Sequence, residues 1–226
     1  MAKNKKQSED KFGAVNSALS KSEAFIERNS KPLIIALVVV VVIVLGIFAL
    51  QRYYFQPRKI AAQEEMFKAQ SFFSIDDYET ALTGDGNYLG FLDIQSQYKG
   101  TQAAKLANYY IGISYLRLGE YDNSIKYLSK FKSKDFYVYA MSKAAIGDAY
   151  MELNNLNSAI KFYKEAAAIH KNENTTPEHL KKLAIAYELN GNNKEALNTY
   201  KKILADYPNT TLKNEVKRGI GKLENI

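Results

Sequence analysis

Residue types that could carry out chemistry are few in this chain of 226 residues. It has no cysteine, which excludes disulfides, thiolate metal ligands and thiol nucleophiles. The two histidines, His170 and His179, are too few for a histidine-rich metal site, and neither belongs to a Ser/His/Asp or HExxH pattern. We interpret His170 as a surface residue of a connector and His179 as an ordinary residue near a helix start.

Two pairs of carboxylates and one glycine cluster are the other candidates for chemistry. Glu64-Glu65 and Asp76-Asp77 fall on polar helix faces, where they favour solvation and local capping. The segment Gly84-Asp85-Gly86-Asn87 has closely spaced glycines, but no strand is expected before it and no Gly-Lys-Ser/Thr follows, which indicates a turn and not a phosphate loop. The sequence therefore predicts a protein that is not an enzyme and that uses no cofactor or metal.

The charge distribution also limits the partners. The net charge is +7, yet Lys and Glu alternate after residue 51 instead of forming a basic stripe. This pattern is typical of solvated helix faces, whereas a nucleic-acid site requires clustered Lys/Arg on a recognisable module. We expect neither a nucleic-acid partner nor a small-molecule substrate.

A single apolar stretch can span a membrane. Residues 32–51 include the run from Pro32 to Leu50, PLIIALVVVVVIVLGIFAL, which has no charged side chain. As a helix it is about 28 Å long, close to the hydrocarbon thickness of a bilayer of about 30 Å. The aromatic segment Tyr53-Tyr54-Phe55 follows it and no small-residue cleavage site does, so we expect a retained anchor with an interfacial aromatic belt. Pro57 predicts that the helix ends or kinks at Gln56.

The orientation of this anchor rests on the tail that precedes it, residues 1–31. Three cations lie close to each end of the apolar stretch, so the local count is a tie. The whole tail carries seven Lys/Arg against four Asp/Glu, which favours a cytoplasmic amino end and a translocated large domain.

The tail has a weak helical pattern of its own. Val15, Leu19, Ser22 and Ile26 fall on one helical face, and Ser20 with Glu23 has the spacing of a capping box. The segment is either an amphipathic helix that contacts membrane or protein, or a weakly helical tether, and residues 29–32 are expected to break it.

Three stretches of the large domain repeat one pattern. They read LANYYIGISYLRLGEYDNSIKYLSKF, MSKAAIGDAYMELNNLNSAIKFYKEA and EHLKKLAIAYELNGNNKEALNTYKKI, with equivalent positions 35 and then 37 residues apart. A small residue (Gly112, Gly147, Ala184) would let the two helices of a hairpin cross closely, and a Tyr stands three residues later. Seven residues after the small one, Gly119, Asn154 and Gly191 suit the left-handed conformation that ends a helix.

This pattern resembles the tetratricopeptide repeat, a helix-turn-helix unit of about 34 residues. The Trp usual early in each unit is missing, and Asn108, Lys143 and Leu180 stand in its place. The resemblance predicts an all-α protein, with an amino-terminal transmembrane helix followed by an α-solenoid. We divide the solenoid into a degenerate first repeat over 58–104, repeats over 105–139, 140–176 and 177–210, and a capping helix within 211–226.

The first helices of the repeats are expected to line a concave, mainly apolar groove that suits a peptide or a partner helix. The expected groove residues are Leu106, Tyr109, Tyr110, Ile113, Leu116, Met141, Ala144, Asp148, Met151, Lys181, Ile185 and Glu188. Several of these aromatic and apolar positions can equally be core between repeats. Tyr109 and Ile113 stand where a carboxylate clamp would need Lys and Asn, so that kind of chaperone binding is not expected.

The whole chain also resembles the YfgM-like family of ancillary Sec translocon subunits, in the form found in Bacteroidetes. The residues that carry this resemblance are the segment SEAFIERN over 22–29, Gly84-Asp85-Gly86 followed by Gly90-Phe91-Leu92, and Tyr98-Lys99-Gly100-Thr101. The resemblance implies a single-pass protein of the bacterial inner membrane, with its amino terminus cytoplasmic and its repeats periplasmic. It also implies partners among translocon subunits and export chaperones.

Two other functions remain open from the sequence. One is a scaffold for cell-envelope assembly or division. The other is a receptor of the import type, with its repeats facing the cytosol.

Overall fold

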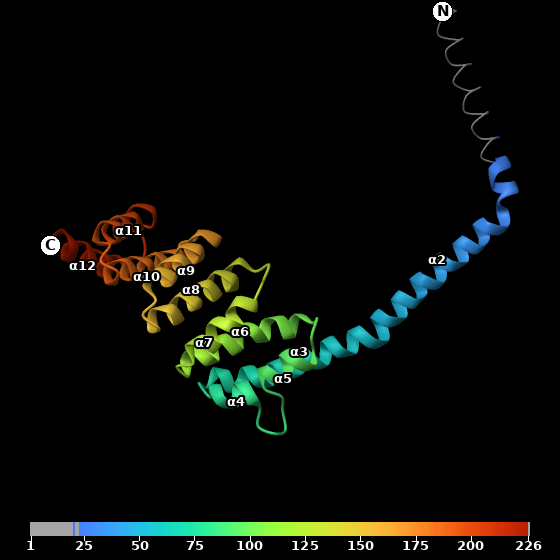
Figure 1. The fold of residues 1–226 in the computed structure, drawn as a ribbon, viewed down its shortest axis with the longest axis horizontal. Coiled ribbons are helices and arrows are strands. Elements are labelled where there is room, and N and C mark those ends of the chain that lie inside the picture. The colour runs from blue at the N-terminus through green and yellow to red at the C-terminus, as the bar shows by residue number, and fades with distance from the viewer. Residues whose placement is uncertain (1–19, 21–22, 226) are drawn as a thin grey trace, which may run out of the picture. The chain divides into compact units, whose positions relative to one another are not determined.

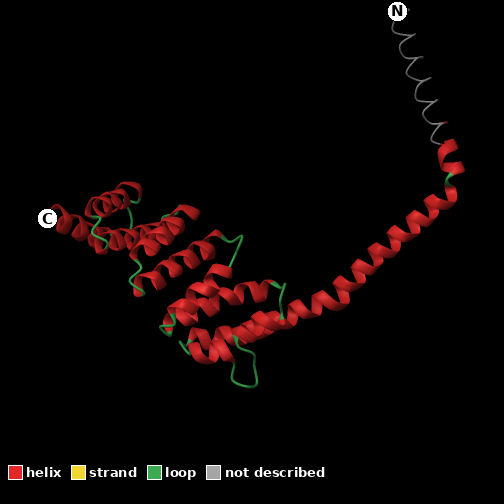
Figure 2. Ribbon diagram, in the orientation of Figure 1, coloured by secondary structure: helices red, strands yellow, loops and turns green. Residues whose placement is uncertain are grey.

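The computed structural model describes residue 20 and residues 23–225 of the chain. The chain separates into two compact units, Met1–Pro57 and Arg58–Ile226. Over the described residues every regular element is a helix, joined by turns and loops (Figures 1 and 2). The all-α prediction is therefore confirmed for that part of the chain.

The first unit contains the apolar helix α2, Ser30–Leu50. Residues 23–28 are helical and Asn29 forms a turn, so the expected break falls at Asn29. Pro32 occupies the third position of α2, inside the first turn, where a missing amide hydrogen removes no intrahelical bond. The remaining positions of the proposed amphipathic face, Val15, Leu19 and Ser22, lie outside the described residues.

Helix α2 is long and apolar enough to cross a membrane, judged by length and composition. None of its residues is buried within the structure, and its large apolar side chains are 41–67% exposed. A helix that is apolar on all sides has no polar face to present to water. The helix thus has the surface that a lipid environment requires.

Of the two outcomes expected at Gln56, a helix end or a kink, the helix end is wrong. A π-helical turn, Gln51–Phe55, follows α2, and the next helix α3, Gln56–Ser74, starts with Gln56 in helical geometry. The amide of Gln56 bonds to the carbonyl of Gln51, one residue further back than in an α-helix. This wider turn changes the bonding pattern just before Pro57, whose ring would clash with the i−4 carbonyl of a regular helix.

The second unit is a stack of helical hairpins. After α3 come two short helices, α4 (Tyr78–Thr83) and α5 (Phe91–Gln97), and then three pairs and a final helix. These are α6 (Gln102–Arg117) with α7 (Tyr121–Lys130), α8 (Phe136–Glu152) with α9 (Leu156–Ile169), α10 (Thr176–Leu189) with α11 (Asn193–Asp206), and α12 (Lys213–Glu224).

Helices α3, α4 and α5 contribute buried side chains to one core, and two short helices, α4 and α5, stand where the later repeats have one long second helix. The loop between them carries the glycine cluster, and Asp85 accepts hydrogen bonds from the amides of Asn87 and Tyr88. These bonds, Tyr88 first, lower the pKa of Asp85. The cluster is thus a turn, as predicted. Glu65 does more than solvate α3, because its carboxylate accepts the amide hydrogen of Leu89 in the same loop, at 3.1 Å.

The predicted helix ends are confirmed. Gly119, Asn154 and Gly191 all have positive φ, at +80°, +54° and +76°. In each case the next amide bonds to the carbonyl of the repeat tyrosine five residues back, for example Asn155 to Tyr150 at 2.8 Å. This is the hydrogen bond of a Schellman motif, which needs a left-handed residue to reverse the chain.

The predicted close crossing of helices is also observed. A Cβ atom placed on Gly147 would lie 2.6 Å from Cε1 of Tyr163 in α9, and one placed on Gly112 would lie 2.4 Å from Cγ of Leu128 in α7. In both hairpins a bulky side chain of the second helix therefore rests directly on the backbone of the first.

Different residues fill the place of the missing tryptophan. Asn108 is buried and its amide donates to the carbonyl of Ala104 at 3.1 Å. Lys143 forms an ion pair with Glu165 at 3.0 Å, with its ammonium 5.3 Å from the ring centre of Phe162. Leu180 joins the apolar core.

The stack ends as expected on α12. Val216 and Leu223 are buried against the core of the last hairpin. The rest of this helix is mostly polar, which allows it to face water and close the stack.

We predict that Gly147→Ala lowers the free energy of unfolding by about 1–3 kcal/mol, because the added methyl group overlaps the Tyr163 ring. Gly221→Ala in α12 is the matched control, since its Cβ would have no neighbour within 4 Å. There the change is expected to stabilise the helix by about 0.5–1 kcal/mol. Urea unfolding followed by circular dichroism measures both. Equal effects at the two positions would contradict the proposed crossing.

Candidate functional site

The first helices of successive hairpins form one face of the stack, and hollows lie along it. The central hollow has a volume of about 440 Å³ and receives side chains from α6, α8 and α10. Four expected groove residues line it together: Leu116, Asp148, Met151 and Ile185. The structure thus brings together residues that are up to 69 positions apart in the sequence.

The chemistry of the central hollow is mixed. Leu116 and Met151 are half-buried and Ile185 is 38% exposed, so they provide apolar contact area. Arg117 and Glu152, both exposed, add charges of opposite sign to the lining. An apolar surface with a few placed charges is suited to a peptide segment.

Asp148 is held by two neighbours within this hollow. Lys182 of α10 donates to both of its carboxylate oxygens, at 2.8 and 2.7 Å, and the hydroxyl of Tyr163 donates to one of them at 2.8 Å. Burial and the nearby Asp148 carboxylate raise the pKa of Tyr163, so its hydroxyl stays protonated and remains a donor. The Asp148 carboxylate of α8 therefore connects α8 to α9 of its own repeat and to α10 of the next repeat.

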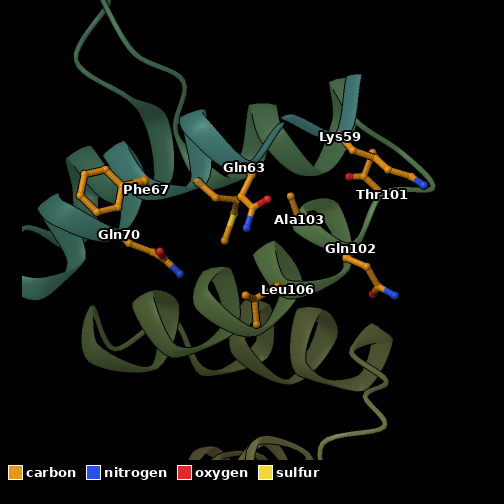
Figure 3. Close-up of a pocket in the computed structure, with 9 residues that line it drawn as sticks. Lys59, Gln63, Phe67, Gln70, Thr101, Gln102, Ala103 and Leu106 are labelled. Atoms are coloured by element: carbon orange, nitrogen blue, oxygen red, sulfur yellow. The ribbon is translucent and has the colours of Figure 1, made fainter. Parts of the chain in front are cut away.

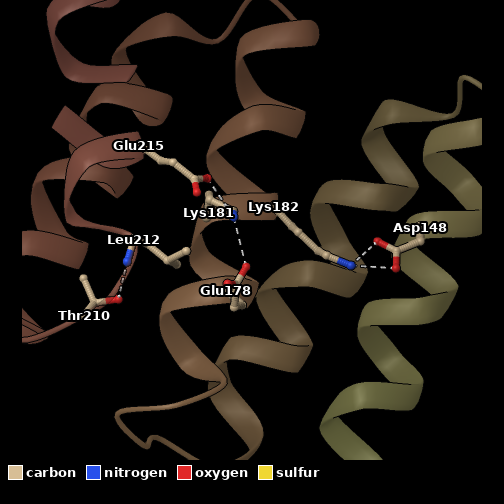
Figure 4. A network of polar contacts seen from close by, with 7 residues as sticks. All are labelled: Asp148, Glu178, Lys181, Lys182, Thr210, Leu212 and Glu215. Atoms are coloured by element: carbon tan, nitrogen blue, oxygen red, sulfur yellow. Dashed lines mark hydrogen bonds and ion pairs between the residues drawn. The ribbon is translucent and has the colours of Figure 1, made fainter. Parts of the chain in front are cut away.

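The other two charged groove residues have equivalent roles. Lys181 pairs with Glu215 of α12 at 3.0 Å, and Glu188 accepts from Lys222 at 2.7 Å and from the Tyr200 hydroxyl at 2.7 Å. Figure 4 shows Lys181 and Lys182 reaching in opposite directions, Lys181 to Glu215 of α12 and Lys182 to Asp148 of α8. Each of these three ion pairs joins residues 34 positions apart, slightly less than the spacing of 35 and 37 residues between equivalent positions of the repeats.

The remaining expected groove residues are distributed between core and surface. Tyr110 stacks on Phe91 with ring centres 4.9 Å apart and belongs to the core around the first hairpin. Tyr109 and Ile113 pack on the core between the next two hairpins. Ala144 is buried and Met141 is 45% exposed. Among these residues, Tyr110 therefore fits the alternative interpretation, in which the residue belongs to the core and not to the groove.

Leu106, the last of the set, lies at the base of another hollow of about 430 Å³ between α3 and α6 (Figure 3). Phe67, 69% exposed, and the amide side chains of Gln63, Gln70 and Gln102 border it. This hollow contains a single charged side chain, that of Lys59.

His179 is a buried titratable residue of α10 whose side chain has no hydrogen-bond partner among the described residues. It is 6% exposed, and neither ring nitrogen is bonded within the structure. Burial, and then the charge of Lys182, lower its pKa, while Asp148 and Glu178 oppose the shift. His170 lies elsewhere, half-buried against Phe136 and Tyr137. In the part of the chain that the structure describes, no cluster of three His, Asp or Glu could hold a metal ion.

Sequence reasoning missed Lys182, Arg117, Glu152 and Tyr163 as residues of the central hollow. A signal for Lys182 was available, because it follows Asp148 by 34 residues, close to the 37-residue spacing of these two repeats. Arg117 and Glu152 carried none, since both stand at helix ends where exposed charges are common.

Comparison with known protein families identifies tetratricopeptide repeats in the chain. Repeat models of this family match residues 106–135 and 182–210, and a second model matches residues 142–172. These segments correspond to the three hairpins α6–α7, α8–α9 and α10–α11. Tetratricopeptide repeats are protein–protein interaction modules, and their presence is confirmed.

Similarity to curated proteins is partial. Photosystem I assembly protein Ycf3 of Prochlorococcus marinus (strain NATL1A) is 35% identical over 77 residues, which cover 34% of this chain and 42% of that protein. Ycf3 of Synechococcus sp. (strain CC9605) is 38% identical over 88 residues, 37% of this chain and 47% of that protein. The chain therefore spans less than half of the length of either relative.

The buried His179 predicts acid sensitivity. Its pKa is lowered in the folded state from an ordinary value of 6.5, so below that pH the unfolded chain takes up a proton that the folded chain does not. The free energy of unfolding should then fall with decreasing pH, by up to about 1.4 kcal/mol per pH unit.

Unfolding by urea at about pH 7 and about pH 5 tests this in the wild type and in His179→Leu, whose carboxylates titrate alike. The wild type should lose more stability over that interval than the variant. Equal losses would rule out a neutral, buried imidazole.

Proposed function

We propose that this protein is a non-enzymatic scaffold that binds peptide segments of partner proteins on the face formed by α6, α8 and α10. The observation that carries this proposal is the central hollow, where Leu116, Met151 and Ile185 come from three successive repeats. A ligand must touch all three helices to cover these side chains, which favours an extended or helical segment over a small molecule.

The charges of the central hollow add selectivity. Asp148 is already paired with Lys182, whereas Arg117 and Glu152 form no ion pair among the described residues. A partner segment with apolar side chains flanked by charges of both signs would therefore match the surface.

We further propose that α2 anchors this scaffold in the bacterial inner membrane, with the amino terminus in the cytoplasm and the repeats in the periplasm. Its length and fully apolar surface support the anchor, and the cationic tail supports the orientation. The resemblance to YfgM-like proteins then suggests partners among translocon subunits and export chaperones.

A second candidate is a scaffold for the assembly of membrane complexes. The partial similarity to proteins named photosystem I assembly protein favours this role. A scaffold for cell-envelope assembly or division would be one protein of this kind. An import-type receptor would need the opposite orientation.

The absence of cysteine makes the orientation directly measurable. We predict that an impermeant maleimide added to spheroplasts labels Ser129→Cys, on an exposed position of α7, and leaves Ser8→Cys unlabelled until the cells are lysed. Labelling of Ser8→Cys alone would show that the orientation is the reverse of the proposed one and would favour the import-type receptor.

Partner binding is tested by photo-crosslinking in living cells. A photoreactive residue at Ile185, which is 38% exposed in the central hollow, should capture specific proteins, whereas the same residue at Asn198 on the exposed side of α11 should not. Capture of translocon subunits or export chaperones supports the first role, and capture of subunits of one membrane complex supports the second. Identical products from Ile185 and Asn198 would contradict a binding site in the hollow.

A further inference from the structure

Lysines gather at one edge of the stack. This edge, here named the basic edge, consists of the loops that lead into the first helices of the hairpins, with the adjoining helix ends. Its exposed lysines are Lys99, Lys105, Lys130, Lys132, Lys134 and Lys171. In Figure 1 the loop before α6 and the loop before α8 lie on the same side of the stack, opposite the loop that joins α8 to α9.

Contacts within the second unit connect this edge to the point where the chain enters it. The guanidinium of Arg58, at the start of α3, donates to the carbonyl of Gln97 beside the α5–α6 loop. Lys59 lines the same hollow as Thr101 and Gln102, at the start of α6. The basic edge is therefore in contact with Arg58, which follows the last residue of α2, Leu50, by only a few positions in the sequence.

A hollow of about 590 Å³ lies in the middle of the basic edge, between the start of α6 and the α7–α8 loop. Leu106, Phe131 and Val138 contribute apolar surface to it. Three lysines, Lys105, Lys132 and Lys134, also line it. Apolar surface beside several cations is the combination that an amphiphilic anion would contact.

Within the described residues, these three lysines have no counterion. Among the described residues, none of them takes part in an ion pair, in contrast to Lys143, Lys181 and Lys182 on other parts of the stack. The one carboxylate of the hollow belongs to Asp135, which accepts the amide hydrogens of Tyr137 and Val138 as the N-cap of α8. The excess positive charge of the basic edge is thus available to an external partner.

Exposed aromatic rings stand beside these lysines. Phe136 is 58% exposed and Tyr137 is 44% exposed, although both begin a helix whose core positions are filled. The ring of His170 stacks on Phe136 with centres 6.0 Å apart and lies 5.1 Å from the Tyr137 ring. Aromatic rings next to Lys side chains are characteristic of protein surfaces at the membrane–water interface.

The opposite edge has the reverse charge. It consists of the turns at the ends of the first helices, and its acidic residues are Asp76, Asp77, Glu79, Glu120, Asp122 and Glu152, with Arg117 as a cation among them. Contacts join these turns too, since the hydroxyl of Tyr121 reaches Glu152 at 3.4 Å. An anionic surface would therefore attract one edge of the stack and repel the other.

We propose that the basic edge docks on anionic phospholipid headgroups of the membrane in which the chain is anchored. This inference rests on the proposed anchoring by α2, which keeps the edge close to the bilayer and so raises its effective concentration there. Lipid phosphates would lie against Lys105, Lys132 and Lys134, and Phe136 and Tyr137 would enter the headgroup region. Docking in this way leaves the central hollow between α6, α8 and α10 open to a partner.

The test uses the full chain in lipid nanodiscs made of phosphatidylcholine alone or mixed with phosphatidylglycerol. A fluorophore is attached at Ser129→Cys, beside the basic edge, or at Ser74→Cys, an exposed serine at the end of α3 near the acidic edge. Lipids that carry a spin label on the headgroup quench a fluorophore that lies close to the membrane surface.

We expect stronger quenching at Ser129→Cys when phosphatidylglycerol is present, and no such change at Ser74→Cys. Reversal of two charges, Lys132→Glu with Lys134→Glu, should lower the ratio of docked to undocked molecules by about thirtyfold or more. High salt should weaken docking in the wild type, since exposed charges are screened.

The outcomes separate the two proposals. A chain that does not insert into nanodiscs overturns the anchoring and, with it, this inference. A chain that inserts but is quenched equally in both lipid mixtures overturns lipid docking alone. A probe at Ser129→Cys that responds to an added polynucleotide or acidic peptide, and not to phosphatidylglycerol, assigns the basic edge to that partner and also overturns the proposal.

Discussion

The close contact between the two helices of the hairpins α6–α7 and α8–α9 is the constraint on which the stack depends. Leu128 rests on Gly112 and Tyr163 rests on Gly147, at distances that leave no room for a Cβ atom. This contact fixes how far apart the helices lie, and the Schellman turns after the first helices fix how the chain reverses. Together they set the direction in which each hairpin presents its first helix, and hence the face that carries the central hollow.

The ion pairs between helices also recur along the stack. Ion pairs between residues 34 positions apart join α8 to α10 and α10 to α12 along the face that is proposed to bind partners. The hydroxyl of Tyr163 donates a hydrogen bond to Asp148, and the hydroxyl of Tyr200 donates one to Glu188, so each tyrosine adds a contact to one of these ion pairs. A partner that contacts Asp148 must share it with Lys182, so binding on this face and contact between neighbouring repeats are physically linked.

The two proposals use separate surfaces of one small stack. Partner proteins would contact the face of the first helices, whereas lipid headgroups would contact the lysine-rich loops at one edge. A tether such as α2 would limit both events to the membrane surface, where a weak interaction is strengthened by high local concentration. The acidic opposite edge would then face away from the bilayer.

The sequence by itself determined the helical class, the position of the apolar helix, the phase of the repeats and the left-handed residues at Gly119, Asn154 and Gly191. These features depend on side chains a few positions apart, which a linear pattern contains. Only the tertiary structure decided that Tyr110 packs into the core, that Lys182 holds Asp148, and that Lys105 meets Lys132 and Lys134 around one hollow. It also showed that a π-turn before Pro57 lets the chain stay helical. Such outcomes depend on which side chains neighbouring helices bring together. The packing between helices determines how close these side chains lie, and their spacing in the sequence does not.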